Sequence, residues 1–326
     1  MPGFSTDPIL PSNQNPLGAL PARFRRQRIL VIGCGDVGLR TARALGAAQG
    51  THRPRVLALT SSPDRKAALR AAGITPLAGN LDHAGSLRRL AGLAHRVLHL
   101  APPPGEGAAG ADWWMDARTV ALARTLRLRA LPAAVVYAST SGVYGDCGGA
   151  RVAETRAVAP ATPRAQRRVN AERAIRHLGR AGTRASILRI PGIYAPDREG
   201  GTPEARLRRG TPVLVADDDV YTNHIHADDL ARACVAALWR GQAQRTYNVS
   251  DASGMKMGDY FDLAADLYGL PRPPRVPRST AQQQLPVSLL SFMGESRQLD
   301  ATRMQRELRL RLRYPTVAHG LRNQPA

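Results

Sequence analysis

The sequence is nearly devoid of lysine. Lys66 and Lys256 are the only two, so the formal net charge of +21 on 326 residues comes almost wholly from arginine. A charge of this size is compatible with nucleic acid or an acidic membrane surface as partner. The arginines are nevertheless spread over all segments, and no run of them alternates with aromatic residues or forms a nucleic-acid-binding motif. We expect an arginine-rich coding bias on solvated helix faces and no specific nucleic-acid partner.

Cysteine is also scarce. Cys34, Cys147 and Cys234 are odd in number and far apart, which fits neither a disulfide framework nor zinc-ligand spacing and favours a reducing compartment. No apolar run approaches the ~18 residues of a membrane helix. The first residues lack the charged-then-apolar order of a secretory signal. We therefore expect a cytoplasmic protein without a membrane partner.

Strands and helices are predicted to alternate along the first half of the chain. Residues 1–22, rich in Pro, Ser and Asn, are expected to form a flexible tail. The pattern then predicts strands at 28–32, 55–59, 75–77, 96–100, 133–138 and 184–190, with helices at 37–48, 64–72, 112–129 and 164–178. This alternation predicts an α/β fold with a doubly wound parallel sheet, the Rossmann fold, over residues 23–190.

The rhythm changes after Pro191, where Gly and Pro become frequent. Helices are predicted at 227–240 and 257–268, and Asp300 resembles the N-cap of a helix at 301–308 that precedes an alternating run at 309–314. We expect residues 191–326 to form mainly a smaller, substrate-side domain, with 222–250 returning to the main sheet.

A glycine-rich turn joins the first strand to the first helix, with Gly33, Gly35 and Gly38 in GxGxxG spacing. Gly33 permits a tight turn, Gly35 lets the backbone approach a pyrophosphate, and Gly38 allows close packing of helix on strand. The free N–H groups of the helix start then hold the phosphates. In this context the motif predicts NAD(P) binding by the residues Gly33, Cys34, Gly35, Asp36, Val37 and Gly38.

The end of the second strand bears on the choice of cofactor. NAD enzymes usually place an acidic residue there, to accept a hydrogen bond from the ribose 2′-hydroxyl. Here Ser61, Ser62 and Arg65 stand at that point, which suits a 2′-phosphate and favours NADP, while Asp64 keeps NAD open. Asn80 and Leu81, after the third strand, complete the candidate cofactor-binding set.

Three further segments carry a family resemblance. Residues 135–145 (VVYASTSGVYG), 188–196 (LRIPGIYAP, with Ala195 in place of a glycine) and 223–231 (NHIHADDLA) resemble extended short-chain dehydrogenases/reductases, the NAD(P)-dependent epimerase/dehydratase group. The stretch from 295–300 to Tyr314-Pro315 is similar to an atypical branch of that group. The resemblance implies an oxidoreductase or epimerase/dehydratase with a small polar substrate, anionic or sugar-like.

The resemblance also implies a catalytic set of Asn, Ser or Thr, Tyr and Lys. Thr140 matches the Ser/Thr position, and Asp116 falls near the Asn position, where the atypical branch carries Asp. Arg164 stands where the tyrosine belongs, and Arg168 where the lysine belongs.

This departure affects the chemistry, because arginine stays protonated and cannot act as a general acid/base. Arg168 can still bind the ribose hydroxyls. Tyr144, Asp116 or Tyr194 are left as alternative proton carriers. Two hypotheses follow: an enzyme with non-standard acid/base residues, or a catalytically silent NAD(P)-binding sensor or scaffold. The oligomeric state is left open.

Helical periodicity predicts which way Arg164 faces. Positions 164, 168, 171, 175 and 178 form one stripe that is apolar from Ala171 onward and should face the sheet. We predict that Arg164, at its start, binds an anionic group of the substrate.

The His224-x-His226-x-Asp228 cluster is attributed to a junction between strand and helix, so no metal is predicted. Cys147 has no evident partner base, so it is expected to be an unreactive loop cysteine.

Overall fold

The computed structural model describes residues 27–47, 53–105 and 112–322. The predicted tail at 1–22 lies outside these residues. Within the part that is described, no helix has the length and apolar character needed to cross a membrane.

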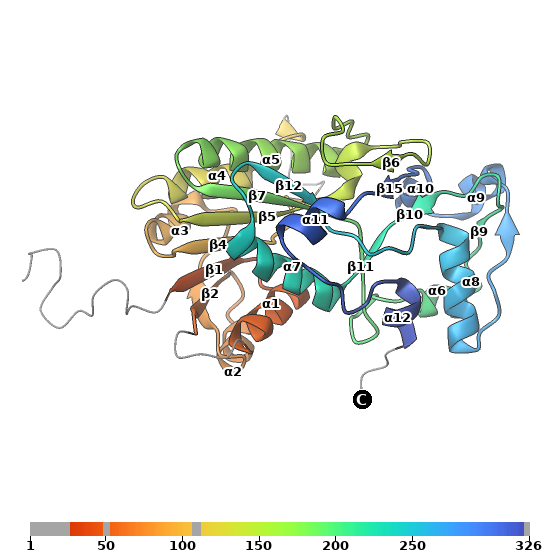
Figure 1. Cartoon of the computed structure of the whole chain (residues 1–326), viewed down its shortest axis with the longest axis horizontal. Coiled ribbons are helices and arrows are strands. Elements are labelled where there is room, and N and C mark those ends of the chain that lie inside the picture. The colour runs from red at the N-terminus through yellow and green to blue at the C-terminus, as the bar shows by residue number, and fades with distance from the viewer. Residues whose placement is uncertain (1–26, 48–52, 106–111, 323–326) are drawn as a thin grey trace, which may run out of the picture.

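A seven-stranded parallel sheet forms the centre of the molecule (Figure 1). Its order is β12-β7-β5-β4-β1-β2-β3. The first two strands in the chain, β1 and β2, pair in register from Arg28 opposite Arg55 to Ile32 opposite Leu59. The order reverses direction at β1, as in a doubly wound fold, and confirms the predicted fold class. The strand bounds are β1 (Arg28–Ile32), β2 (Arg55–Thr60), β3 (Thr75–Ala78), β4 (Arg96–His99), β5 (Ala134–Thr140), β7 (Arg184–Ile190) and β12 (Arg245–Asn248).

Helices cover both faces of this sheet. Side chains alternate between the faces of a strand, so Ile29 and Val31 of β1 pack with α1 (Asp36–Gly46) and α7 (Ala227–Arg240). Leu30 and Ile32 instead pack with α4 (Ala117–Leu126) and α5 (Pro163–Arg180). The central strands are buried on both sides, as parallel strands usually are. Two shorter helices complete these layers: α2 (Arg65–Ala71) packs beside β2 and β3, and α3 (Ala84–Leu87) packs beside α4.

The helix bounds follow from local capping. Helix α5 begins after Thr162, whose hydroxyl accepts a hydrogen bond from the Ala165 N–H. Helix α4 is shorter than the predicted 112–129, because Asp116 caps it by accepting from the Thr119 N–H. The predicted bounds of α7 are confirmed.

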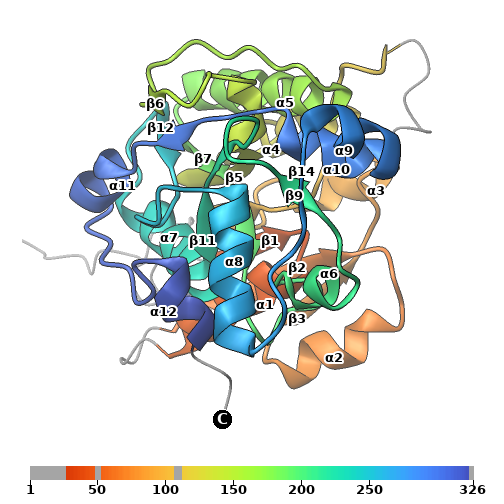
Figure 2. The same cartoon turned by 90° about the vertical axis from the view of Figure 1, so that its right-hand side faces the viewer.

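A second, smaller group of elements lies beyond the carboxyl ends of the strands and faces the viewer in Figure 2. Its own apolar core includes Leu207, Val213, Phe261 and Val317. The helices of this group are α6 (Glu204–Arg208), α8 (Met257–Tyr268), α9 (Arg278–Gln284), α10 (Val287–Met293) and α12 (Val317–Arg322). Helix α11 (Thr302–Glu307) instead packs beside β12, with Met304 in the core of the main sheet. The short strands are β6 (Arg151–Val152), β8 (Gly192–Tyr194), β9 (Val213–Leu214), β10 (Tyr221–Thr222), β11 (His224–His226), β13 (Met255–Lys256), β14 (Arg275–Val276) and β15 (Gln298–Leu299).

The C-terminal segment departs from the prediction in two places. Helix α11 starts one residue later than expected, and the Asp300 carboxylate accepts from the Thr302 N–H at its start. The alternating run at 309–314 is not a strand. Its Leu310 is buried in the core under α7, while Arg309 has a φ of +51° that breaks an extended chain.

Candidate functional site

The glycine turn between β1 and α1 has a separate physical reason for each of its three glycines. Gly33 has a φ of +84°, and a Cβ there would lie 2.4 Å from the backbone nitrogen of Ala101. A Cβ on Gly38 would come within 3.2 Å of the Cys34 Sγ. A Cβ on Gly35 would meet nothing within 4 Å. The turn is therefore closed on its inner side and open at Gly35, where a pyrophosphate can approach the N-terminus of α1.

A buried arginine connects this turn to two other segments. Arg40 in α1 is 5% exposed and donates to Asp36 (2.9 Å), Asp197 (2.6 Å) and Asp228 (2.6 Å). Burial disfavours the charged form, but the three carboxylates raise the pKa of Arg40 above its ordinary value. Asp36 also accepts from Arg198 at 2.6 Å. The network fixes the turn against the start of α7 and the loop that holds residues 197 and 198.

Candidate cofactor residues meet at the carboxyl ends of β1 and β2. Arg65 reaches back across the turn and donates from Nη2 to the Cys34 carbonyl at 2.5 Å. Ser61 is exposed and Ser62 half-buried, and the Ser62 N–H donates to the Thr60 hydroxyl. Asp64 is exposed at the start of α2. The only guanidinium that contacts the turn from this strand end is therefore that of Arg65, among the residues that the structure describes.

Asn80 and Leu81 lie in the next loop of the same edge. The Asn80 side-chain oxygen accepts from the Asp82 N–H, and Leu81 packs on the core cluster beneath α4.

A cleft of about 580 Å³ opens beside the turn, at the carboxyl ends of β5 and β7. Its walls come from the start of α5, the loop after β8, α6, α8 and the segment before β15. Four arginines line it, against Glu295 as the only carboxylate of the lining within the described chain: Arg164, Arg198, Arg206 and Arg297. Glu295 accepts from Arg297 at 2.7 Å and Asp36 accepts from Arg198, so Arg164 and Arg206 are left without an acidic partner among the described residues. The cleft is suited to an anion.

Arg206 is the one cation of this set in which two buried donor atoms lack a partner among the described residues. Its guanidinium lies 4.3 Å above the centre of the Phe261 ring. Its Nε and Nη2 are buried and make no hydrogen bond with any described residue. A buried donor without a partner is costly, so a ligand oxygen that reaches these atoms would gain the bond that the protein leaves unmade.

The candidate residues at the start of α5 have different environments. Arg164 is exposed and lines the cleft. Arg168 is buried, and its Nη1 donates to the Ala138 carbonyl (2.6 Å) and the Tyr137 hydroxyl (3.1 Å). Thr140 lines the cleft, where its hydroxyl accepts from the Gly142 N–H at 3.2 Å. Arg164 and Thr140 thus share the cleft, whereas Arg168 is bonded to strand β5.

Asp116 and Tyr144 do not line the cleft. Asp116 is 1% exposed, and burial raises the pKa of its carboxyl. Its Oδ2 accepts from the Thr119 hydroxyl at 2.7 Å. The Tyr144 hydroxyl donates to Asn248 Oδ1 at 2.8 Å, and burial raises the pKa of this phenol as well. The Asp116 side chain thus caps its own helix α4, and that of Tyr144 joins its loop to strand β12.

Tyr194, the third alternative, does line the cleft, and its hydroxyl donates to the Thr316 carbonyl at 3.2 Å. Burial raises its pKa far above the ordinary value, so the phenol stays protonated.

The two histidines of strand β11 pack with aromatic rings. The His224 ring centre lies 4.2 Å from that of Tyr260, and the His226 ring centre lies 3.7 Å from that of Tyr314. Burial lowers the pKa of His224 to about 4, so it is neutral at physiological pH. No group of three His, Cys, Asp or Glu residues able to hold a metal occurs in the described ranges. The Cys147 thiol donates to the Tyr144 and Gly145 carbonyls and packs on a small apolar cluster.

Sequence reasoning missed three of the four cleft arginines, Arg198, Arg206 and Arg297. They belong to three separate segments, and none stands in a motif. Arg297 lies in the stretch that resembles the atypical branch, but nothing in its spacing points to a cleft.

A family model described as the NAD dependent epimerase/dehydratase family matches residues 29–250. No curated protein sequence matches the chain. A functionally unknown conserved protein from Silicibacter pomeroyi DSS has a solved structure that is 28% identical, with a TM-score of 0.70, 91% of this chain covered and 97% of that one.

Two epimerase structures share the fold at lower identity. One is the UDP-glucose 4-epimerase of Thermotoga maritima, solved with UDP-glucose (18% identity, TM-score 0.73, 90% and 96% covered). The other is the UDP-glucuronic acid 4-epimerase of Bacillus cereus, in complex with NAD (18% identity, TM-score 0.69, 90% and 96% covered). With its glycine turn, its doubly wound sheet and a family match over most of its length, the chain belongs to the NAD-dependent epimerase/dehydratase family and binds a nicotinamide cofactor.

Proposed function

We propose that the protein is an NADP-dependent oxidoreductase of epimerase-like type, acting on a small anionic, sugar-like substrate. The observation that carries the proposal is the arginine-lined cleft beside the open glycine turn. Arg198 connects the two, because it lines the cleft and its guanidinium donates to Asp36 of the turn. A substrate in the cleft would therefore lie next to the cofactor.

The preference for NADP rests on Arg65. Its guanidinium lies across the turn, bonded to the Cys34 carbonyl, at the end of a strand that carries no acid before Asp64. A 2′-phosphate on the adenine ribose can be bound by this guanidinium and by the Ser61 and Ser62 hydroxyls. The 2′-hydroxyl of NAD offers no charge for Arg65 to neutralise.

The substrate class rests on Arg164 and Arg206. Arginine binds phosphate and carboxylate through two parallel hydrogen bonds, which a tyrosine at position 164 could not do. Arg206 adds two buried, unpartnered donor atoms from helix α6. The Thermotoga and Bacillus enzymes are named as epimerases of UDP-glucose and UDP-glucuronic acid, which are nucleoside-diphosphate sugars. The diphosphate of such a substrate would suit these arginines.

The chemistry requires a proton carrier other than arginine. When bound, a nicotinamide cofactor supplies or accepts a hydride. Of the tyrosines that line the cleft, Tyr194 is bonded to the Thr316 carbonyl, while the hydroxyls of Tyr221 and Tyr260 make no hydrogen bond with described residues. Tyr260 is nearly buried, and burial raises its pKa. We therefore assign proton transfer to Tyr221, with Thr140 orienting the substrate hydroxyl.

Fluorescence titration with NADPH and NADH tests the cofactor assignment. Arg65→Ala should weaken NADPH binding by about 10- to 100-fold and change NADH binding little, as expected for one charged hydrogen-bonding group. Arg70→Ala, which removes an exposed arginine from the same helix α2, is the matched control. Tighter binding of NADH than of NADPH by the unaltered protein would disprove the preference.

A thermal-shift screen of nucleoside-diphosphate sugars and sugar phosphates, with NADPH present, tests the substrate assignment. Arg164→Ala should abolish the shift given by any binding compound and leave NADPH affinity unchanged. Arg173→Ala, an exposed position farther along α5, should change neither. If no anionic compound shifts the melting temperature, the arginines of the cleft do not mark a substrate site.

A catalytically silent NAD(P)-binding sensor or scaffold is the second candidate. It is favoured by Arg168, whose guanidinium is bonded to the Ala138 carbonyl and Tyr137 hydroxyl of β5 and occupies the family's lysine position. Absorbance of the nicotinamide band, measured together with chromatography of the sugar nucleotide, separates the two candidates, because an epimerase returns the hydride within each turnover and leaves no net absorbance change. Binding of cofactor and sugar nucleotide with neither an absorbance change nor conversion of the sugar over hours would favour the sensor.

A further inference from the structure

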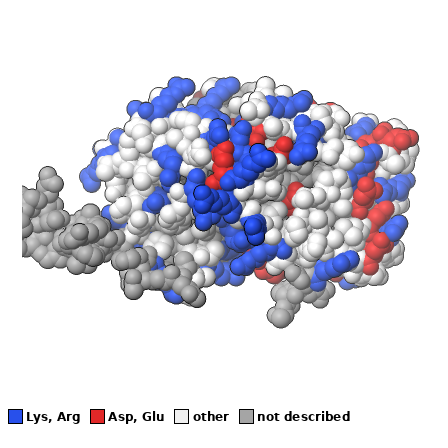
Figure 3. All heavy atoms as spheres, viewed as in Figure 1, with Lys and Arg blue, Asp and Glu red and all other residues white. Residues whose placement is uncertain are grey.

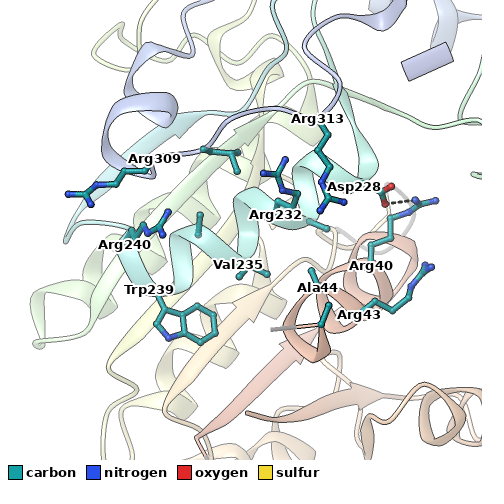
Figure 4. A pocket seen from close by; sticks show the side chains of 14 residues that line it. Arg40, Arg43, Ala44, Asp228, Arg232, Val235, Trp239, Arg240, Arg309 and Arg313 are labelled. Atoms are coloured by element: carbon teal, nitrogen blue, oxygen red, sulfur yellow. Dashed lines mark hydrogen bonds and ion pairs between the residues drawn. The ribbon is translucent and has the colours of Figure 1, made fainter. Parts of the chain in front are cut away.

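A second concave site lies away from the cleft, on the face of the sheet covered by α1 and α7. It is a groove of about 630 Å³ between these two helices and the chain that follows α11. Figure 4 shows its lining, and Figure 3 shows Lys and Arg side chains gathered on the face that contains it. No residue of this lining belongs to the lining of the cleft.

The groove has a large excess of positive charge. Asp228 is the one carboxylate of the lining in the described chain, against Arg40, Arg43, Arg232, Arg240, Arg309 and Arg313. Asp228 is bonded to Arg40, and Arg232 is paired with Asp229 at 2.6 Å. Two of the six cations are therefore neutralised.

The other four have no acidic partner among the described residues. The side chains of Arg43, Arg309 and Arg313 are exposed and take part in no ion pair. Arg240 donates to the Leu308 carbonyl, which leaves its charge uncompensated. Unpaired guanidinium groups held together repel one another, so an anion bound between them is favoured.

The backbone presents two of these arginines to the groove. Leu310 is buried under α7 and Leu312 packs on the same core, so the alternate residues Arg309 and Arg313 stay at the surface. Arg309 holds a φ of +51°, a conformation that is unfavourable for a residue with a side chain. The chain is thus bent at a residue that lines the groove.

The cations form two groups. Figure 4 shows Arg240 and Arg309 with Trp239 at one end, Arg43, Arg232 and Arg313 toward the other, and Val235 between them. Arg232 and Arg240 are eight residues apart on α7, which places their Cα atoms about 12 Å apart along the helix at the usual rise per residue. A single small anion can contact one group, whereas an elongated one can contact both.

We propose that this groove binds a small oligophosphate, either free or as the phosphate chain of a nucleotide. A guanidinium group forms two parallel hydrogen bonds with phosphate oxygens, and a chain of several phosphates would contact both groups of arginines. The volume is that of a small-molecule site and not of a duplex. Trp239, 37% exposed at one end, offers an indole for the base of a nucleotide.

Isothermal titration with orthophosphate, tripolyphosphate and ATP tests the proposal. Tripolyphosphate should bind at least about tenfold more tightly than orthophosphate, because only the longer anion contacts both groups. Equal affinity of ATP and tripolyphosphate would identify free oligophosphate as the ligand. Tighter binding of ATP, lost in Trp239→Phe, would identify a nucleotide.

The double variant Arg309→Gln/Arg313→Gln should weaken tripolyphosphate binding by about tenfold or more. Arg306→Gln/Arg311→Gln is the matched control, because it removes the same net charge from exposed positions of the same segment outside the groove. It should change the affinity less than about twofold.

Equal losses in the two double variants would show that overall charge, and not the groove, attracts the anion, and would overturn the proposal. So would displacement of tripolyphosphate by a DNA duplex at lower concentration. NADPH affinity should be the same in both variants and the unaltered protein, so failure of this proposal is distinguishable from failure of the proposed function.

Discussion

Asp251, three residues after the end of strand β12, should make the stability of the protein fall as the pH rises. Its carboxyl is 7% exposed, and one oxygen accepts from the Ser253 N–H at 3.0 Å. The other oxygen, Oδ2, is buried and makes no hydrogen bond with the described residues. Burial, with a smaller contribution from the nearby Asp229, raises the pKa of Asp251 from its ordinary 3.8 to about 7.

The direction of the effect follows from proton binding. The folded chain keeps a proton on Asp251 up to about pH 7, whereas the unfolded chain releases it near pH 3.8. The stabilisation is therefore fully present below pH 3.8 and is lost as the pH rises through 7. For these two pKa values, the loss between pH 5 and pH 8 is about 2.5 kcal/mol of unfolding free energy.

Replacing Asp251 by Asn removes the titration and keeps the acceptor for Ser253. Urea denaturation of both proteins at pH 5, 6, 7 and 8, followed by circular dichroism, measures the two stability profiles. The profile of Asp251→Asn should be flatter than that of the unaltered protein by about 2.5 kcal/mol over this range.

Asp217→Asn, at an exposed carboxyl, is the control and should leave the profile unchanged in shape. Parallel profiles for Asp251→Asn and the unaltered protein would refute the reasoning, because Asp251 would then titrate alike in both states.

Three further predictions concern the turn, Tyr144 and the net charge. Gly35→Val should fold normally but lose cofactor affinity in fluorescence titration, whereas Gly33→Ala should lower the unfolding free energy by about 2 kcal/mol, since its Cβ would collide with Ala101. Normal NADPH binding by Gly35→Val would mean that the cofactor lies elsewhere. Tyr144→Phe should cost about 1 kcal/mol, the bond to Asn248, and leave cofactor affinity intact. Filter binding to duplex DNA should show only weak, salt-sensitive association, and sequence-selective binding below micromolar concentration would contradict this.

The sequence by itself determined the fold class and the position of the glycine turn. Both depend on local rules: a strand and a helix have different apolar periods, and a turn that must bend at Gly33 and pack at Gly38 needs glycine at those positions. The order of the motifs along the chain also identified the family from the sequence. Helix bounds were predicted less accurately. Helix α4 begins at Ala117, five residues after the predicted 112, because Asp116 caps it there.

The tertiary structure alone decided which side chains meet. Arg164 and Arg168 stand one helical turn apart, yet one lines the cleft and the other bonds to β5, because burial differs along the helix. Arg206 and Arg297 come to the same cleft from segments about 90 residues apart in the sequence. The run at 309–314 alternates like a strand, but no strand of the described residues pairs with it, and its leucines pack into the main core instead. Periodicity and motifs are properties of neighbours in the chain, whereas charge clusters, buried donors and pKa shifts arise only when distant segments pack.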